Sequence, residues 1–170
     1  MMKTLILACL LFVPMAPPTP AQAPQQDPLL DHLIGTWVLR GTIESKETTH
    51  DVTFEWVLGC EYVRMHEVSR EKDQKGQPAY EAIVFIGWDA ASRRYACLWL
   101  DSTGGGGLAA QSIGHAPASK SELAFLFDFG GARFHTTFRY NSAAGTWQWF
   151  MDGEEGGRLQ PFARVTLTRK

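Results

Sequence analysis

The histidines are the residues best suited to metal binding or proton transfer, but their spacing gives no ready-made site. The sequence contains no H-x-x-x-H pair, no C-x-x-C and no H-E-x-x-H segment, which are the patterns typical of preformed metal sites. His66 and His135 fall within expected strands, where either ring could face an interior as a ligand or a base. An exposed or hydrogen-bonded histidine is the commoner situation and is the alternative for both.

Other catalytic signatures are weak. Ser102 has no G-x-S-x-G setting and no histidine close to it in sequence. The glycines at 104–107 are not followed by Lys-Ser or Lys-Thr, so they do not form a phosphate-binding loop. Haem needs an axial ligand in an apolar pocket. Because none of the catalytic or metal-binding motifs above is present, we expect no cofactor and favour a protein that is not an enzyme. A haem protein, or an enzyme that uses His66 or His135, is the alternative.

Residues 133–140 alternate sharply between two faces. Phe138 lies on an aromatic face, whereas His135 and Arg139 lie on the opposite, polar face. With the aromatic face inward, His135 and Arg139 are solvent residues. With a wet interior, they would anchor an anion, because the planar guanidinium of arginine pairs well with carboxylates.

Asp101 ends an expected strand just before the glycine-rich turn. Aspartates in such positions commonly accept hydrogen bonds from turn amides. The functional alternative is a polar group at the mouth of a cavity, since Asp101 shares its face with Trp99 and Cys97.

Large aromatic residues are numerous, with six Trp and ten Phe. Phe54 and Trp56 follow the clean alternation of residues 51–58, and Phe138 follows that of 133–140. Trp88 and Trp99 come from strands that are apolar on both faces. We expect these residues to line an apolar cavity: Phe54, Trp56, Trp88, Trp99 and Phe138.

The elements that must position these residues are nearly all strands. Ten short segments of strand character are separated by Gly, Asn, Asp and Ser turns, and no helix long enough for a parallel crossover follows Gly35. The sequence predicts an all-β, antiparallel, up-and-down barrel, preceded by a short plug helix that Asp27 caps and Pro28 begins. The expected strands are 37–44, 51–58, 62–69, 80–88, 95–101, 111–115, 123–129, 133–140, 147–151 and 162–169.

The N-terminus has the three parts of a secretory signal peptide. Lys3 precedes an apolar run at 5–13, and a small-x-small pattern stands at 21–23. The run is far shorter than the ~20 residues of a membrane-spanning helix. We expect a signal peptide at 1–23, a single barrel domain at 24–170, and a periplasmic or secreted product. Cys60 and Cys97 then form a disulfide or remain separate buried thiols.

Length and charge exclude other classes. A chain of 170 residues suits one domain, and 45% apolar with 20% charged residues is ordinary globular composition. The net charge of -2 and the absence of a Lys/Arg block argue against a nucleic-acid partner.

Several motifs resemble those of known families. Gly35-Thr36-Trp37, after a short apolar helix, resembles the G-x-W segment of calycins, which include lipocalins, fatty-acid-binding proteins and nitrobindin-like barrels. Gly87-Trp88-Asp89, Arg93-Arg94-Tyr95 and Trp99-Leu100-Asp101-Ser102, with Gly114 beyond them, resemble a bacterial secreted family of unknown function. Trp56-Val57-Leu58-Gly59-Cys60 is similar to that family's W-x-L-G-G segment, with Cys60 replacing the second glycine. The resemblance implies a calycin-like barrel of about ten strands and no established activity.

The resemblance also implies a structural pair, because the G-x-W tryptophan of calycins commonly meets a basic residue of the last strand. Arg164 and Arg169 are the candidates, and they point to opposite faces of one strand. Arg169 shares its face with the apolar Val165 and Leu167. We therefore predict that the Arg169 guanidinium lies over the Trp37 indole.

Together, these observations predict a periplasmic or secreted barrel that binds a small, mainly apolar molecule in its interior. The candidate ligand-binding residues are Phe54, Trp56, His66, Trp88, Trp99, Asp101, His135, Phe138 and Arg139. Two alternatives remain open: a haem protein or enzyme on the same barrel, and an interaction module with a packed interior and no ligand.

Overall fold

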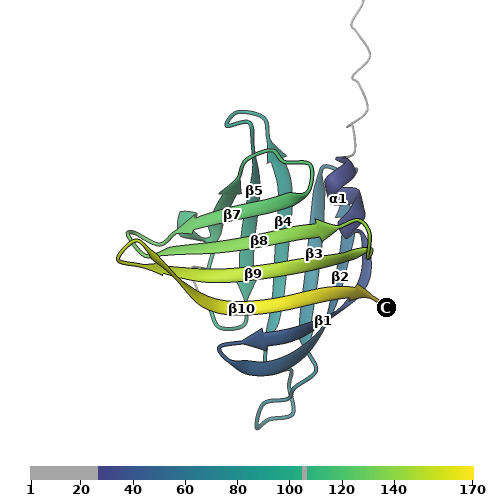
Figure 1. Ribbon diagram of the computed structural model, residues 1–170, viewed down its shortest axis with the longest axis vertical. Helices are drawn as coiled ribbons and strands as arrows, with labels where there is room; N and C mark the ends of the chain where they lie inside the picture. Colours follow the sequence, from purple (N-terminus) through teal and green to yellow (C-terminus); the bar gives the residue numbers. More distant parts are fainter. Residues whose placement is uncertain (1–26, 105–106) are drawn as a thin grey trace, which may run out of the picture.

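In the computed structural model, which describes residues 27–104 and 107–170, the strands form one closed antiparallel barrel (Figure 1). Each strand pairs with its neighbours in sequence, and the last strand closes the barrel against the first. The elements are α1 (Pro28–Leu33), β1 (Gly35–Ile43), β2 (Lys46–Val57), β3 (Tyr62–Ser69), β4 (Glu81–Asp89), β5 (Arg94–Asp101), η1 (Ala110–Ser112), β6 (Ile113–Ala116), β7 (Glu122–Asp128), β8 (Arg133–Asn141), β9 (Thr146–Glu155) and β10 (Arg158–Arg169). The predicted ten-stranded antiparallel barrel with a short N-terminal helix is confirmed.

Helix α1 is the predicted plug. Asp27 caps it by accepting hydrogen bonds from the amides of Leu29 (2.8 Å) and Leu30 (3.4 Å), and Pro28 occupies its first position. Leu29, Leu30 and Leu33 are buried against the barrel core. The helix lies across one end of the barrel (Figure 1).

Three ring hydrogen bonds tie α1 to that end. The Trp37 Nε1–H donates to the carbonyl of Leu33 (2.6 Å), the Trp147 Nε1–H to the carbonyl of His32 (3.2 Å), and the Trp56 Nε1–H to the Asp31 carboxylate (2.8 Å). The β2–β3 and β8–β9 turns lie at this closed end. Because strand direction alternates, the β1–β2, β3–β4, β5–β6, β7–β8 and β9–β10 connections lie at the opposite end.

Some element boundaries differ from the sequence expectation. Strand β2 begins at Lys46, five residues before the expected start, and pairs with β1 along its added length. Leu58 was expected in this strand but lies in a turn, with a positive φ of 52° and 74% of its surface exposed. The longer β2 matters for function because it carries inward-facing polar residues beyond the apolar run.

The structure bears on the expected cysteine pairing and on the question of a membrane-spanning helix. Cys97 is a fully buried thiol whose pKa is raised by burial, and it forms no disulfide with Cys60. No helix in the described ranges is long and apolar enough to cross a membrane. The expected signal peptide at 1–23 lies outside the described residues.

Candidate functional site

The barrel encloses a cavity of about 480 Å³ in the half away from α1. Its wall is made by Ile43, Glu44, Lys46, Glu47, Thr48, His50, Glu67, Ser69, Glu71, Ala79, Tyr80, Trp99, Asp101, Thr103, Ser112, Phe127, Phe129, Phe134, Thr136, Met151 and Phe162. These residues include members of the β1–β2 turn and the segments that follow β3, β5 and β7, all at the end opposite the helix. The cavity therefore lies toward the end that α1 leaves uncovered.

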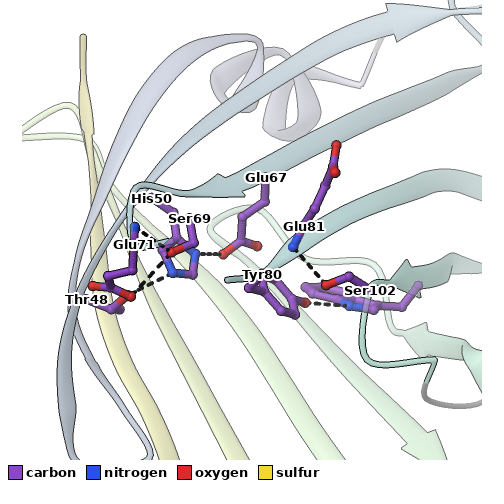
Figure 2. A network of polar contacts seen from close by, with 9 residues as sticks. Thr48, His50, Glu67, Ser69, Glu71, Tyr80, Glu81 and Ser102 are labelled. Carbon is purple, nitrogen blue, oxygen red and sulfur yellow. Dashed lines mark hydrogen bonds and ion pairs between the residues drawn. The ribbon is translucent and has the colours of Figure 1, made fainter. Parts of the chain in front are cut away.

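The cavity has two chemically different walls. Strands β7 to β10 contribute an aromatic and apolar wall, in which Phe134 meets Phe162 edge to face at 5.5 Å between ring centroids. Strands β2 and β3 contribute a polar wall that contains Thr48, His50 and Glu67. Figure 2 shows this polar wall, with Glu67 between His50 and Tyr80. A ligand in the cavity would contact both kinds of surface.

Strand alternation explains why polar side chains point inward on β2 and β3. On β2, Thr48 and His50 have the same parity as the buried Val52. On β3, Glu67 and Ser69 have the same parity as the buried Met65 and Val63. His50 pairs with Ser69, and Val52 pairs with Glu67, so His50 and Glu67 are diagonal neighbours on the inner face.

A continuous set of hydrogen bonds joins the polar wall. His50 Nδ1 lies 2.5 Å from Oε1 of Glu67, and His50 Nε2 lies 2.8 Å from the Thr48 hydroxyl oxygen. The hydroxyl oxygens of Thr48 and Ser69 lie 3.1 and 3.3 Å from Oε2 of Glu71. His50 and Glu67 are almost completely buried, so water does not screen their contact.

The one hydroxyl hydrogen of Thr48 can serve only one of its two acceptors, Glu71 Oε2 at 3.1 Å or His50 Nε2 at 2.8 Å. When Thr48 donates to Glu71, its oxygen accepts from Nε2–H of His50, and the His50–Glu67 pair has no net charge. When Thr48 donates to His50, the Nδ1–H of a neutral His50 donates to the Glu67 carboxylate, and the pair carries one negative charge. In both arrangements one proton lies between His50 Nδ1 and Oε1 of Glu67.

Two polar atoms of the cavity wall have no hydrogen-bond partner among the described residues. They are Oε2 of Glu67 and the hydroxyl oxygen of Ser112. Both residues are 2% exposed or less. Because an unsatisfied buried polar atom opposes folding, these two atoms mark positions where a bound molecule would gain hydrogen bonds.

Tyr80 links the polar wall to Trp99 and Asp101. The Trp99 Nε1–H donates to the Tyr80 hydroxyl oxygen at 3.2 Å, and the Tyr80 ring stacks on His50 at 5.8 Å between ring centroids. Burial raises the pKa of Tyr80 well above its usual value, and the nearby carboxylates of Glu67 and Asp101 raise it further. Tyr80 is therefore a neutral phenol rather than a base.

Of the residues predicted as ligand contacts, two line the cavity and two others are fully buried nearer to α1. Trp99 and Asp101 line the cavity. Asp101 also accepts hydrogen bonds from the amide (2.9 Å) and hydroxyl (2.5 Å) of Thr103, so it has the turn-forming role as well as a place at the mouth. Phe54 and Phe138 are buried, but they lie further toward α1 than the cavity wall.

The other predicted contacts do not reach the cavity. Trp88 is 47% exposed, and Trp56 is half-buried with its ring N–H on Asp31. The expectation that these two line the cavity is wrong. Trp88 has the same parity as the buried Ile86 on β4, and Trp56 has the same parity as the buried Phe54 on β2. Both lie at the α1 end of their strands, beyond the cavity wall.

The predicted histidines and arginine lie on the outer face, each beside a carboxylate. His66 Nε2 lies 2.7 Å from Glu81, His135 Nε2 lies 2.9 Å from Glu154, and Arg139 donates to Glu122 at 3.1 Å. The expectation that these three residues contact a ligand in the cavity is wrong. On β8 the aromatic face points inward, so His135 and Arg139 lie on the outer face, which was one of the two alternatives for this strand.

Sequence reasoning missed His50 and Glu67, the two most buried ionisable residues of the wall. His50 was placed in a turn because the apolar alternation of β2 begins only at Val52. Continuing that alternation by one step would have directed His50 inward. The corresponding signal for Glu67 was weaker, because apolar residues occupy both parities of β3, with Met65 on one face and Val68 on the other.

The polar wall contains a carboxylate, an imidazole and a hydroxyl in the order found in acyl-transfer triads. The hydrogen bonds, however, run against that chemistry. The single hydroxyl hydrogen of Thr48 faces Glu71 Oε2 as well as His50 Nε2, so a carboxylate competes with the imidazole for the proton of the would-be nucleophile. The Glu71 carboxylate would also repel the negative charge that develops in acyl transfer. The arrangement suits hydrogen bonding to a ligand better than nucleophilic attack.

Metal binding has no support in the described geometry. Within residues 27–104 and 107–170, no group of three or more His, Cys, Asp or Glu side chains could hold a metal ion.

Comparison with models of known protein families gives no match, and comparison with curated proteins gives none either. The proposals below therefore rest on the barrel and its cavity.

Proposed function

We propose that this protein holds one small, mainly apolar molecule inside its barrel. The observation that carries the proposal is the cavity of about 480 Å³ with an aromatic wall on one side and a few fixed polar groups on the other. A volume of this size is typical of small-molecule sites, which are concave and mostly apolar, with a few polar groups that orient the ligand. The two unsatisfied polar atoms in the wall also favour an occupied cavity over a packed one.

The same proposal includes kinship with calycin-like barrels and with the bacterial secreted family. It is supported by the glycine and tryptophan at the start of β1 and by the ten-stranded closed barrel that follows a plug helix. The family likeness gives no activity, so the binding function is argued from the cavity alone.

A haem protein is a weaker candidate on geometric grounds. His66 and His135, the ligands considered from the sequence, lie outside the barrel beside Glu81 and Glu154. His50 faces the interior, but Glu67 and Thr48 occupy both of its ring nitrogens. A Soret band in the purified protein would contradict this ranking.

Occupancy of the cavity is tested by blocking it. Thr136 is buried in the cavity wall, and the next residue, Thr137, lies on the outer face of β8. We expect the fluorescent probe N-phenyl-1-naphthylamine to bind the wild-type protein. Thr136→Phe should weaken probe binding at least about tenfold, or ~1.4 kcal/mol, and Thr137→Phe should leave it unchanged.

Holding a small molecule inside the barrel is called the carrier function below, and two results would overturn it. One is a wild-type protein that gives no saturable probe signal and releases no small molecule on organic extraction and mass spectrometry. The other is equal probe binding by folded Thr136→Phe and Thr137→Phe proteins, because the probe would then bind elsewhere.

We also propose export to the periplasm or medium, on the pattern of Lys3, the apolar run 5–13 and the small residues at 21–23. N-terminal sequencing of protein from an exporting host should find a first residue within 16–26. An intact Met1 on protein from the cytosol would contradict this proposal.

A further inference from the structure

Glu67 has one carboxylate oxygen whose bonding the described residues leave incomplete. The side chain is 2% exposed and lines the cavity. Its Oε1 is engaged by His50, whereas its Oε2 has no hydrogen-bond partner among the described residues. A carboxylate oxygen is an acceptor, so the missing partner is a hydrogen-bond donor.

The charges around Glu67 indicate what kind of donor is favoured. The cavity wall contains five carboxylates, those of Glu44, Glu47, Glu67, Glu71 and Asp101, and one ammonium group, that of Lys46. Glu67 shares a proton with His50, but the other four carboxylates by themselves outnumber the one ammonium group.

The other four carboxylates of the wall form no ion pair with a basic side chain of the described residues. Among the ion pairs of the described part of the chain, none includes Glu44, Glu47, Glu71 or Asp101. A cavity lined by one sign of charge concentrates ligands of the opposite sign and repels those of its own. An anionic ligand such as a fatty acid would meet this repulsion, whereas a cation would not.

The wall opposite Glu67 suits the remainder of such a ligand. Phe127, Phe134, Phe162 and Trp99 offer apolar surface to a hydrocarbon or aromatic body. Aromatic faces also attract an ammonium group directly. The two walls together match a molecule that has a cationic head and an apolar body.

We propose that the cavity is selective for amphiphilic amines, with the protonated amine donating to Oε2 of Glu67. This inference rests on the proposed carrier function and specifies the ligand class of the same site. Glu67 is then the specificity-determining residue, and the surrounding carboxylates favour the cation over a neutral alcohol of the same shape.

The test uses three ligands that share one apolar chain: decylamine, decan-1-ol and decanoate. Each is titrated near pH 7 against bound N-phenyl-1-naphthylamine, below its micelle concentration. For the wild-type protein we expect decylamine to displace the probe at a concentration at least about tenfold lower than decan-1-ol, with decanoate the weakest of the three.

A matched pair of variants locates the preference. Glu67→Gln keeps the shape of the side chain but replaces the carboxyl group that accepts from the amine, and it should reduce the amine-to-alcohol ratio about tenfold. Glu81→Gln removes a carboxylate from the outer face, where it pairs with His66, and should keep the wild-type ratio. If Glu67→Gln does not fold, the order of the three ligands on the wild-type protein still decides the question.

Failure of this inference and failure of the carrier function give different results. If the probe binds but decan-1-ol or decanoate displaces it as well as decylamine does, the amine preference is wrong and the carrier function stands. An unchanged amine preference in folded Glu67→Gln protein would likewise overturn the assignment to Glu67. If neither the probe nor any decyl compound binds, the carrier function itself is wrong.

Discussion

Arg169 holds its guanidinium over the indole ring of Trp37, with 4.2 Å between the Cζ atom and the ring centroid. The two residues are partners across the β1–β10 pairing that closes the barrel. Arg169 Nη1 also donates to the carbonyl of Ile34 at 2.7 Å. One side chain therefore links the last strand to the first strand and to the end of α1, and the predicted Trp37–Arg169 pair is confirmed.

Removal of Arg169 should cost more stability than removal of Arg164. Arg169→Ala loses both the cation–π contact and the hydrogen bond to Ile34, which we expect to cost about 2 kcal/mol. Arg164 pairs with Asp152 on the outer face and donates to backbone carbonyls of its own sheet, so its loss should cost about 1 kcal/mol or less. Denaturant unfolding measures both, and equal losses would contradict the closing role of Arg169.

A side chain at Gly35 should displace the same arginine from its contacts. Its φ is +132°, and a Cβ built on it would lie 2.0 Å from Arg169 Nη1. Gly35→Ala should therefore destabilise by about 3 kcal/mol or more, through backbone strain and displacement of the guanidinium. Gly130 also has a positive φ, +77°, but open space around it, so Gly130→Ala should show backbone strain alone, about 1 kcal/mol.

A double-mutant cycle separates the two causes at Gly35. In the Arg169→Ala background, part of the cost of Gly35→Ala should disappear, because the clash is gone while the strain remains. Full additivity in denaturant unfolding would mean that the arginine contact does not explain the glycine.

Period-two alternation predicted most of the strands, but the Trp37–Arg169 pair needed more than alternation. The resemblance to calycins implied a basic partner for Trp37, and alternation then separated Arg169 from Arg164. On β8, alternation put Phe138 on the face opposite to His135 and left open which face points inward. Arg169 nevertheless lies at the exposed rim rather than inside the barrel, because the strand ends there. Alternation assigns a face to a residue but does not give its depth along the barrel axis.

The candidate site was harder to predict for the same reason. Phe54 and Phe138 have the expected face but lie too close to α1 to reach the cavity. His50 and Glu67 lie on the inner face beyond its apolar stretch, next to the polar Thr48 and Ser69, so patterning by hydrophobicity passes over them. Their role depends on the pairing register of β2 with β3, which no local pattern specifies.

The buried His50–Glu67 contact should contribute far more stability than the exposed His66–Glu81 contact. His50→Ala removes the partner of Oε1, so that both oxygens of the buried Glu67 carboxyl group lack a hydrogen-bond partner among the described residues. This change should cost about 3 kcal/mol or more. His66→Ala removes a partner from a half-exposed carboxylate and should cost less than about 1 kcal/mol. Denaturant unfolding of both variants compares them, and similar losses would mean that the His50 network does not support the wall.

Asp51 should make stability fall in acid. Its carboxylate accepts two hydrogen bonds from Arg70, at 2.7 and 3.0 Å, and lies 3.2 Å from Nζ of Lys170. The Arg70 hydrogen bonds, and secondarily Lys170, lower the pKa of Asp51 from 3.8 to about 2. Because the pKa is lower in the folded state, the stabilisation is complete above about pH 5, declines below about pH 4 and is lost as the pH falls through 2.

Comparison with Asp51→Asn isolates this contribution from those of the other carboxylates. The wild-type advantage in unfolding free energy should be constant above about pH 5, decline between pH 4 and 2, and vanish below about pH 2. The side chain is 38% exposed, so solvent screening should keep the advantage below about 1 kcal/mol, and 1 M salt should reduce it further. Arg70→Ala should lose most of the same pH-dependent part. An advantage that persists unchanged at pH 2 would show that Asp51 stabilises the barrel by something other than its charge.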